Sequence, residues 1–204
     1  MQQNTTIALR GRSGPRRSLR AEDARSLLRM NTLDLHIRAE DVLGTYSCET
    51  IVGYVGMLQS NLAVTEAVHR GTEPLLPPHM REGLALDVRR LREDLAKLDA
   101  GPHGNDAHLD LEDPSGAIGA LYVLEGARLG GKLLARRVEA ELGLTAEHGA
   151  SYLNGDGADT GRRWRQFLAA LEERLVSAED LARAIAAARM TFRLVIRQYE
   201  KISG

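Results

Sequence analysis

The sequence is poor in several residue types, and each shortage excludes a class of protein. It has one cysteine, Cys48, which excludes an internal disulfide and a cysteine-rich metal site and makes a reducing cytoplasm the expected location. Its apolar runs are far too short to span a bilayer, and the first residues lack the apolar core of a signal peptide. A formal net charge of −1 gives no global attraction to nucleic acid or to a membrane surface, so we expect neither as a partner.

The composition also disfavours β-structure. Aromatic residues make up only 4% of the chain, and Val and Ile are sparse, although these are the residues that strands prefer. Leu, Ala, Arg and Glu, which are strong helix formers, are abundant instead, and the basic residues are 24 Arg against 3 Lys. A chain of 204 residues can bury its own core without a disulfide or metal. The composition therefore predicts an all-α protein.

The hydrophobic pattern divides the chain into a basic arm and one helical domain. Residues 1–17 carry four arginines, no acidic residue and no apolar period, which predicts a flexible arm. From residue 18 to 204 the apolar residues follow helical periods, which predicts a single-domain bundle of about six to seven helices. The expected helices cover 20–43, a stretch from near Ser47 to about 70, a third helix with its apolar repeat from Leu84 to Leu98, 114–142, a helix from near Thr160 with its apolar stripe from Trp164 to Leu175, and the residues after Ser177. Loops are expected at 71–78, 99–113 and 149–161.

Local signals mark several ends of these helices. Asp113 followed by Pro114 is a favourable helix start, with the aspartate as the cap and the proline in the first turn. Gly143 is expected to end the same helix. The segment from Ser177 to Asp180 resembles a capping box, with an acidic residue three positions after the serine.

His36 differs from the other histidines, because it lies well inside a predicted helix. Thr32 and Glu40 lie four residues before and after it and therefore share its face. Glu40 can accept a hydrogen bond from one ring nitrogen, which leaves the other nitrogen for a metal. A hydrogen-bonded histidine at a contact between two helices explains the same spacing, so the pattern alone leaves both interpretations open.

The helix predicted over 114–142 contains three glycines within six residues, Gly126, Gly130 and Gly131. Each interior glycine costs about 1 kcal/mol of helix stability relative to alanine, so the cluster needs a reason. Gly126 and Gly130 are four residues apart and leave one face bare, which would let a flat ligand lie close to the backbone. Tight packing against a neighbouring helix is the alternative explanation.

An imidazole on one side and a bare glycine face on the other describe a slot that suits heme. Three segments resemble the bacterial heme oxygenases, in particular those associated with bacteriophytochromes. Residues 32–40 resemble the family's Thr-x-x-x-His-x-x-x-Glu pattern, whose histidine is the proximal iron ligand. Residues 119–131 resemble its glycine-rich distal helix, and residues 161–167 are similar to the segment that carries a base for a heme propionate.

The resemblance implies the all-helical heme oxygenase fold, with heme sandwiched between a proximal helix and a kinked, glycine-rich distal helix. Ala127 stands at a position where the family often has Ser or Asp. The implied site consists of the iron ligand and its partner (His36, Glu40), the distal wall of catalytic glycines and its neighbour (Gly126, Gly130, Gly131, Ala127), and two bases for the propionates (Arg165, Arg29).

The implied reaction uses heme as both substrate and prosthetic group. It consumes dioxygen and electrons from an external donor, such as a ferredoxin or a reductase, and releases biliverdin, carbon monoxide and iron. A bacteriophytochrome is the implied acceptor of the bilin. The alternative, which Ala127 keeps open, is a non-catalytic heme carrier or sensor on the same fold. A helical adaptor, in which His36 and the glycines only pack, is the third hypothesis.

Overall fold

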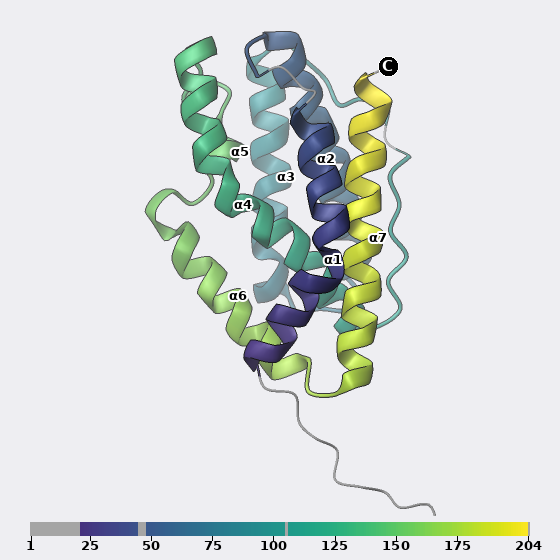
Figure 1. Ribbon diagram of the computed structural model, residues 1–204. Helices are drawn as coiled ribbons and strands as arrows, with labels where there is room; N and C mark the ends of the chain where they lie inside the picture. The colour runs from purple at the N-terminus through teal and green to yellow at the C-terminus, as the bar shows by residue number, and fades with distance from the viewer. Residues whose placement is uncertain (1–20, 45–47, 105, 204) are drawn as a thin grey trace, which may run out of the picture.

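The computed structural model describes residues 21–44, 48–104 and 106–203 (Figure 1). All regular structure in these ranges is helical, which confirms the predicted all-α class. The predicted arm, residues 1–17, lies outside the described residues. The elements are α1 (Ala21–Gly44), α2 (Ile51–Thr72), α3 (Pro78–Lys97), α4 (Pro114–Leu142), α5 (Ser151–Asn154), the 3₁₀-helix η1 (Gly157–Asp159), α6 (Thr160–Arg174) and α7 (Ala178–Ser203).

Helix α7 packs against α1, α2 and α4. Helix α2 packs against α3, α6 packs against α1 and α4, and the short α5 packs against α3 and α4. Four of the helices, α1, α2, α3 and α7, run roughly along the long axis of the molecule, whereas α4 crosses obliquely and changes direction along its length (Figure 1). This arrangement brings the middle of α4 opposite α1.

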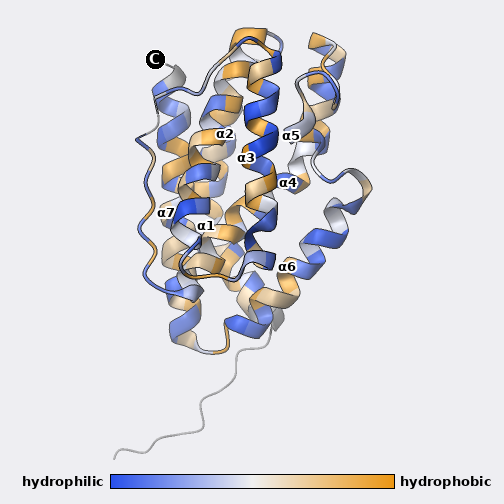
Figure 2. Ribbon diagram, turned by 180° about the vertical axis from the view of Figure 1, so that it is seen from behind, coloured by the Kyte–Doolittle hydropathy of each residue, from blue (hydrophilic) through white to orange (hydrophobic). Residues whose placement is uncertain are grey.

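Apolar and polar residues recur in turn along the helices (Figure 2). Buried residues of α7 share one helical face, among them Leu181, Ala188, Phe192 and Tyr199, which are seven or four residues apart. An apolar stripe of this kind buries one face of a helix and leaves the other in water. Among the described residues, no helix is long and apolar enough to cross a membrane.

The predicted caps are confirmed. The Asp113 carboxylate accepts hydrogen bonds from the backbone amides two and three residues later, at 2.8 and 3.0 Å. Gly143 follows α4 with a φ of 68°, the left-handed conformation that glycine adopts without strain. Ser177 and Asp180 form the reciprocal capping box: the Asp180 amide donates to Ser177 Oγ at 3.1 Å and the Ser177 amide donates to Asp180 Oδ2 at 3.2 Å.

Two predicted helix ends shift by a few residues. Helix α2 begins at Ile51, later than the predicted start near Ser47, because the Thr50 side chain caps it by accepting from the amide three residues on, at 3.2 Å. Helix α3 ends at Lys97, so Leu98, the last residue of the predicted apolar repeat, is the C-cap.

The prediction of a loop over 149–161 is wrong, because this segment contains α5, η1 and the first residues of α6. The start of α5 is capped by Asp94, a fully buried residue of α3. Its carboxylate accepts from the amide and hydroxyl of Ser151, at 3.0 and 2.8 Å, and from the amide of Tyr152 at 2.8 Å. A cap supplied from another helix leaves no local signal in the sequence, which explains the error.

Candidate functional site

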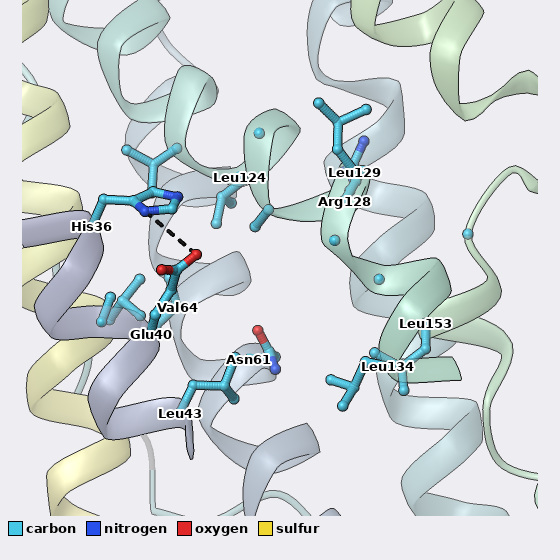
Figure 3. A pocket seen from close by; sticks show the side chains of 18 of the residues that line it. His36, Glu40, Leu43, Asn61, Val64, Leu124, Arg128, Leu129, Leu134 and Leu153 are labelled. Carbon is cyan, nitrogen blue, oxygen red and sulfur yellow. Dashed lines mark ion pairs between the residues drawn. The ribbon is translucent and has the colours of Figure 1, made fainter. Parts of the chain in front are cut away.

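A cavity of about 820 Å³ lies between α1 and α4, with side chains of α2 between them (Figure 3). Its volume falls in the range of about 300–1,000 Å³ that small-molecule sites occupy. Apolar side chains form most of its wall. All of the predicted site residues except Arg165 line it: Arg29, His36, Glu40, Gly126, Ala127, Gly130 and Gly131.

The α1 wall of the cavity presents the predicted face of Thr32, His36 and Glu40. Nδ1 of His36 lies 3.5 Å from Oε1 of Glu40, and the side chain of His36 is 52% exposed. The ring meets Phe192 of α7 edge-on, with the centroids 5.7 Å apart and an interplanar angle of 71°. Because Glu40 engages Nδ1, the second ring nitrogen, Nε2, is left to meet a ligand in the cavity.

The three predicted glycines of α4 have two different surroundings. A Cβ added at Gly126 or at Gly130 would meet nothing within 4 Å, so both glycines leave open space on the cavity side of the helix. A Cβ added at Gly131 would lie 2.9 Å from the carbonyl oxygen of Leu153 in α5. Gly131 therefore allows the close packing of α5, which is the alternative that the sequence left open, although it also borders the cavity.

One end of the cavity is cationic and includes a residue that the sequence analysis missed. Arg25 and Arg29 line it together with Tyr122 and Trp164, and the Arg25 guanidinium lies 5.8 Å from the centre of the Trp164 ring. Burial raises the pKa of Tyr122, and the two nearby guanidiniums oppose this effect. Arg25 precedes Arg29 by four residues, so the helical period was a signal that could have found it.

Arg165 does not line the cavity; it is exposed, and its neighbour Trp164 lines the cavity instead. The sequence analysis expected a basic residue of this segment to reach the heme. Successive residues of an α-helix point about 100° apart, so only one of the two can face α1. The indole of Trp164 takes this direction because it stacks on Phe167, with the ring centroids 5.6 Å apart.

A chain of polar groups, also missed by the sequence analysis, lines another part of the cavity. The Tyr152 hydroxyl donates to Asn61 Oδ1 at 3.3 Å, and Asn61 Nδ2 donates to the Tyr199 hydroxyl at 2.6 Å. Burial raises the pKa of Tyr152, so its hydroxyl keeps its proton and remains a donor at neutral pH. The three residues come from α5, α2 and α7, and no spacing in the sequence connects them.

This arrangement suits one kind of ligand. The imidazole of His36 offers a metal a nitrogen ligand, and the bare backbone at Gly126 and Gly130 admits a flat group close to α4. The guanidiniums of Arg25 and Arg29 suit a carboxylate at one edge of the ligand. The site therefore fits a planar, largely apolar molecule that carries a metal at its centre and acidic groups at one edge.

The comparisons with known proteins point to one family. The sequence profile of the family described as Heme oxygenase matches residues 89–201, which include α4, α6 and most of α7. A heme oxygenase of Xanthomonas campestris pv. campestris (strain 8004) is 37% identical over 110 residues, which are 52% of this chain and 62% of that protein. The chain thus matches less than two thirds of the length of this relative.

A solved structure supports the fold over nearly the whole chain. The crystal structure of heme oxygenase from Neisseria meningitidis, determined with nitric oxide and carbon monoxide bound, superposes with a TM-score of 0.76. The superposition covers 89% of this chain and 92% of that one, at 24% sequence identity. At this identity the likeness shows a shared fold.

Proposed function

The chain belongs to the heme oxygenase family, and from this premise we propose that it binds heme between α1 and α4 and cleaves it to biliverdin, carbon monoxide and iron. One observation carries the proposal: His36 lines the α1 side of the cavity, and the bare backbone of Gly126 and Gly130 lines the α4 side. A ligand between them would have a metal ligand on one face and free space for dioxygen on the other.

His36 would hold the heme iron through Nε2. Glu40, 3.5 Å from Nδ1, favours the tautomer that carries its proton on Nδ1 and leaves Nε2 unprotonated for the metal. Bound heme supplies an iron centre at which dioxygen is reduced beside the macrocycle that is to be cleaved. A neutral imidazole donates less electron density to iron than a thiolate does. It therefore promotes early cleavage of the dioxygen bond less strongly than a thiolate would.

Arg25 and Arg29 would orient the heme by binding its propionates. Both guanidiniums line the cavity, where they can pair with an acidic ligand. A charge-assisted hydrogen bond contributes about 1.5–3 kcal/mol. Because the two arginines lie at one end of the cavity, they would select one rotation of the heme and with it the carbon that is attacked.

The remaining walls would control water and protons. Apolar side chains such as Val64, Leu124 and Leu134 surround the space between α1 and α4 and exclude bulk water (Figure 3). The Tyr152 hydroxyl, whose proton goes to Asn61, would accept a hydrogen bond from ordered water near the α4 wall, in place of the polar side chain that Ala127 lacks.

The proposed reaction also needs molecules that come from outside the chain. Dioxygen is the oxidant, and an electron-donor protein such as a ferredoxin or a reductase would supply the electrons. We propose a bacteriophytochrome as the acceptor of the bilin. Membership of the family supports the first two requirements, and the resemblance of residues 32–40 and 119–131 to the bacteriophytochrome-associated enzymes supports the third.

A hemin titration followed by turnover tests the proposal. Hemin should bind with a stoichiometry of one per chain and give a Soret band, and ascorbate or a reduced ferredoxin under air should then convert that band into biliverdin absorption near the red end of the visible spectrum. Carbon monoxide should appear in parallel. A Soret band without bilin from either electron source would make the protein a heme carrier. The absence of any Soret band would leave only the adaptor hypothesis.

A further inference from the structure

Six charged side chains join α4 to α3 and α6 at the α4 wall of the cavity, and two of them, Arg128 and Asp156, also line the cavity. We call them the charge cluster: Asp87, Arg90, Glu125, Arg128, Asp156 and Arg163. Glu125 and Arg128 immediately flank Gly126 and Ala127 in the sequence. Glu125 is 5% exposed, and its carboxylate accepts from Arg128 Nη1 at 2.9 Å. The residues that flank Gly126 and Ala127 are therefore bonded to each other.

The cluster ties this part of α4 to two other helices. Arg163 of α6 donates to both oxygens of Glu125, at 2.9 Å from Nη2 and 3.2 Å from Nε. Arg128 pairs with Asp87 of α3 and donates to the carbonyl oxygen of Gly83 at 3.2 Å. A paired guanidinium and carboxylate fix orientation as well as distance.

The remaining contacts close the cluster into one network. Asp156, from the segment between α5 and η1, accepts from Arg163 at 3.1 Å and from Arg90 at 3.0 Å. Arg90 also lies 3.5 Å from Asp87. Three carboxylates thus balance three guanidiniums, so the removal of one member leaves the cluster with an uncompensated charge.

The backbone makes room for this network at Gly83 of α3. A Cβ added there would lie 1.3 Å from Nη2 of Arg163, the atom that binds Glu125. No side chain larger than that of glycine is compatible with the observed position of the guanidinium. The fit between a bare position on α3 and an arginine of α6 shows that the network is a specific feature of the packing.

A buried ion network is weak evidence for stability, because desolvation of the charges offsets their attraction. The ion pairs do restrain the relative positions of the helices that carry them. The glycine-rich part of α4 needs such a restraint. Three glycines within six residues make a helix easy to bend, and α4 changes direction along its length (Figure 1). If the backbone at Gly126 and Gly130 were free to shift, it would not present a defined surface to a ligand.

We propose that the charge cluster fixes the position of Gly126 and Ala127 relative to the cavity, and that Glu125 and Arg163 are positioning residues of the reaction. This inference rests on the proposed function, because it assigns these residues a role in placing the wall beside which dioxygen is reduced. They act through the backbone of α4 and do not contact the heme. A purely stabilising network is the competing explanation.

The test compares Glu125→Gln with Asp34→Asn. The first removes the charge of Glu125 and keeps its shape, and the charge-balanced double variant Glu125→Gln/Arg163→Gln removes the whole pair. Asp34 is the control because it forms another two-point interhelical ion pair, a more exposed one, with Arg189 at 2.7 and 2.9 Å, and neither residue lines the cavity. Arg163→Lys keeps the charge without the fork of donors and serves if Glu125→Gln does not fold.

Two readouts besides activity decide the matter. In the heme-free protein, amide hydrogen exchange over residues 121–134 should become at least about tenfold faster in Glu125→Gln and in the double variant, and stay unchanged in Asp34→Asn. In the ferrous carbon monoxide complex, the C–O stretching band should shift or broaden in the same variants only. Bilin formation should fall by about 10- to 100-fold at a hemin affinity within about threefold of wild type.

Each outcome has one meaning. If Glu125→Gln lowers the unfolding midpoint but leaves the exchange of residues 121–134 and the C–O band as in Asp34→Asn, the network only stabilises the fold and the inference is overturned. If Arg163→Lys matches wild type in both readouts, the fork geometry has no positioning role, which also overturns it. If wild type binds hemin without forming bilin, the proposed function fails, while the exchange of the heme-free variants still decides whether the cluster fixes α4.

Discussion

Gly131 of α4 and Leu153 of α5 pack backbone against backbone: a Cβ at Gly131 would lie 2.9 Å from the Leu153 carbonyl oxygen. One residue earlier, a Cβ at Gly130 would meet nothing within 4 Å. The two adjacent glycines therefore have different surroundings. Gly131 is required by the packing of backbone against backbone, whereas Gly130 borders open space in the cavity, where the proposed function expects the ligand.

This difference gives a matched pair of variants. Gly131→Ala should lose about 1–3 kcal/mol of stability, because a backbone carbonyl cannot move aside as a flexible side chain can. Gly130→Ala should gain up to about 1 kcal/mol, since alanine favours the helix and nothing opposes its methyl group. Gly130→Leu should keep helicity and heme but lose bilin formation. Urea unfolding and the bilin assay measure both effects, and normal turnover by Gly130→Leu would show that this face does not border the reaction.

His36→Ala should abolish the native ferric spectrum of the hemin complex, because it removes the nitrogen expected to bind iron. Glu40→Ala should still bind hemin but shift the iron–histidine stretch of the ferrous form, since it removes the acceptor at Nδ1. His108→Ala is the control: His108 also pairs with a carboxylate, that of Asp110 at 2.6 Å, but lies outside the cavity. An unchanged iron–histidine stretch in His36→Ala, measured by resonance Raman, would assign the ligand to another residue.

Arg29→Glu should weaken hemin binding by about 10- to 100-fold, because it replaces an expected partner of a propionate with a like charge. It should also change the proportions of the biliverdin isomers, if the arginines select the rotation of the heme. Arg165→Glu is the matched control, as Arg165 is an exposed arginine that the cavity does not include. A hemin titration and separation of the isomers measure both. Loss of affinity in Arg165→Glu but not in Arg29→Glu would move the propionates to the α6 side.

The charge cluster should make stability depend on acid pH. Burial raises the pKa of Asp156, but hydrogen bonds from Arg90 and Arg163 outweigh burial and hold this pKa below its ordinary value of 3.8. A carboxyl group with a lowered folded-state pKa stabilises the fold above pH 3.8, and this stability is lost as the pH falls through the folded pKa. The urea midpoint of wild type should therefore fall more steeply below about pH 4 than that of Asp156→Asn.

Asp87 should change stability with pH in the opposite direction to Asp156, and the same experiment measures it. Burial raises its pKa despite the nearby guanidiniums of Arg128, Arg163 and Arg90. Its contribution to stability is therefore greatest below its unfolded pKa and is lost as the pH rises through the folded pKa. Asp87→Asn should remove a component that lowers stability with rising pH. Parallel midpoint curves for wild type and both variants would show that neither carboxyl group governs the pH dependence.

Ala127→Ser should raise the rate of bilin formation. Ala127 is exposed and lines the cavity, so a hydroxyl there would add a donor where only backbone groups and Tyr152 are expected to hold water. Hemin affinity should stay the same, since no charged group changes. Single-turnover measurements with ascorbate compare the variant with wild type. An equal or lower rate would show that Tyr152 and the backbone already suffice.

The sequence by itself determined the class of fold, most helix boundaries and one wall of the site. Asp113, Gly143 and the Ser177–Asp180 box act on backbone groups within three residues of themselves, so their effect can be predicted without knowledge of the rest of the molecule. The face of His36 and Glu40 follows equally from the helical period. Interactions of this kind are fixed by distance along the chain.

Only the tertiary structure decided which residues meet across helices. The spacing of the glycines could not show that Gly131 packs on α5 and that Gly130 does not, nor that Trp164 rather than Arg165 faces α1. The cap that Asp94 gives to α5 lies 57 positions away in the chain. These outcomes depend on the angle and depth at which one helix packs on another. That geometry is set by the combined shape of many side chains, which no single segment of the sequence contains.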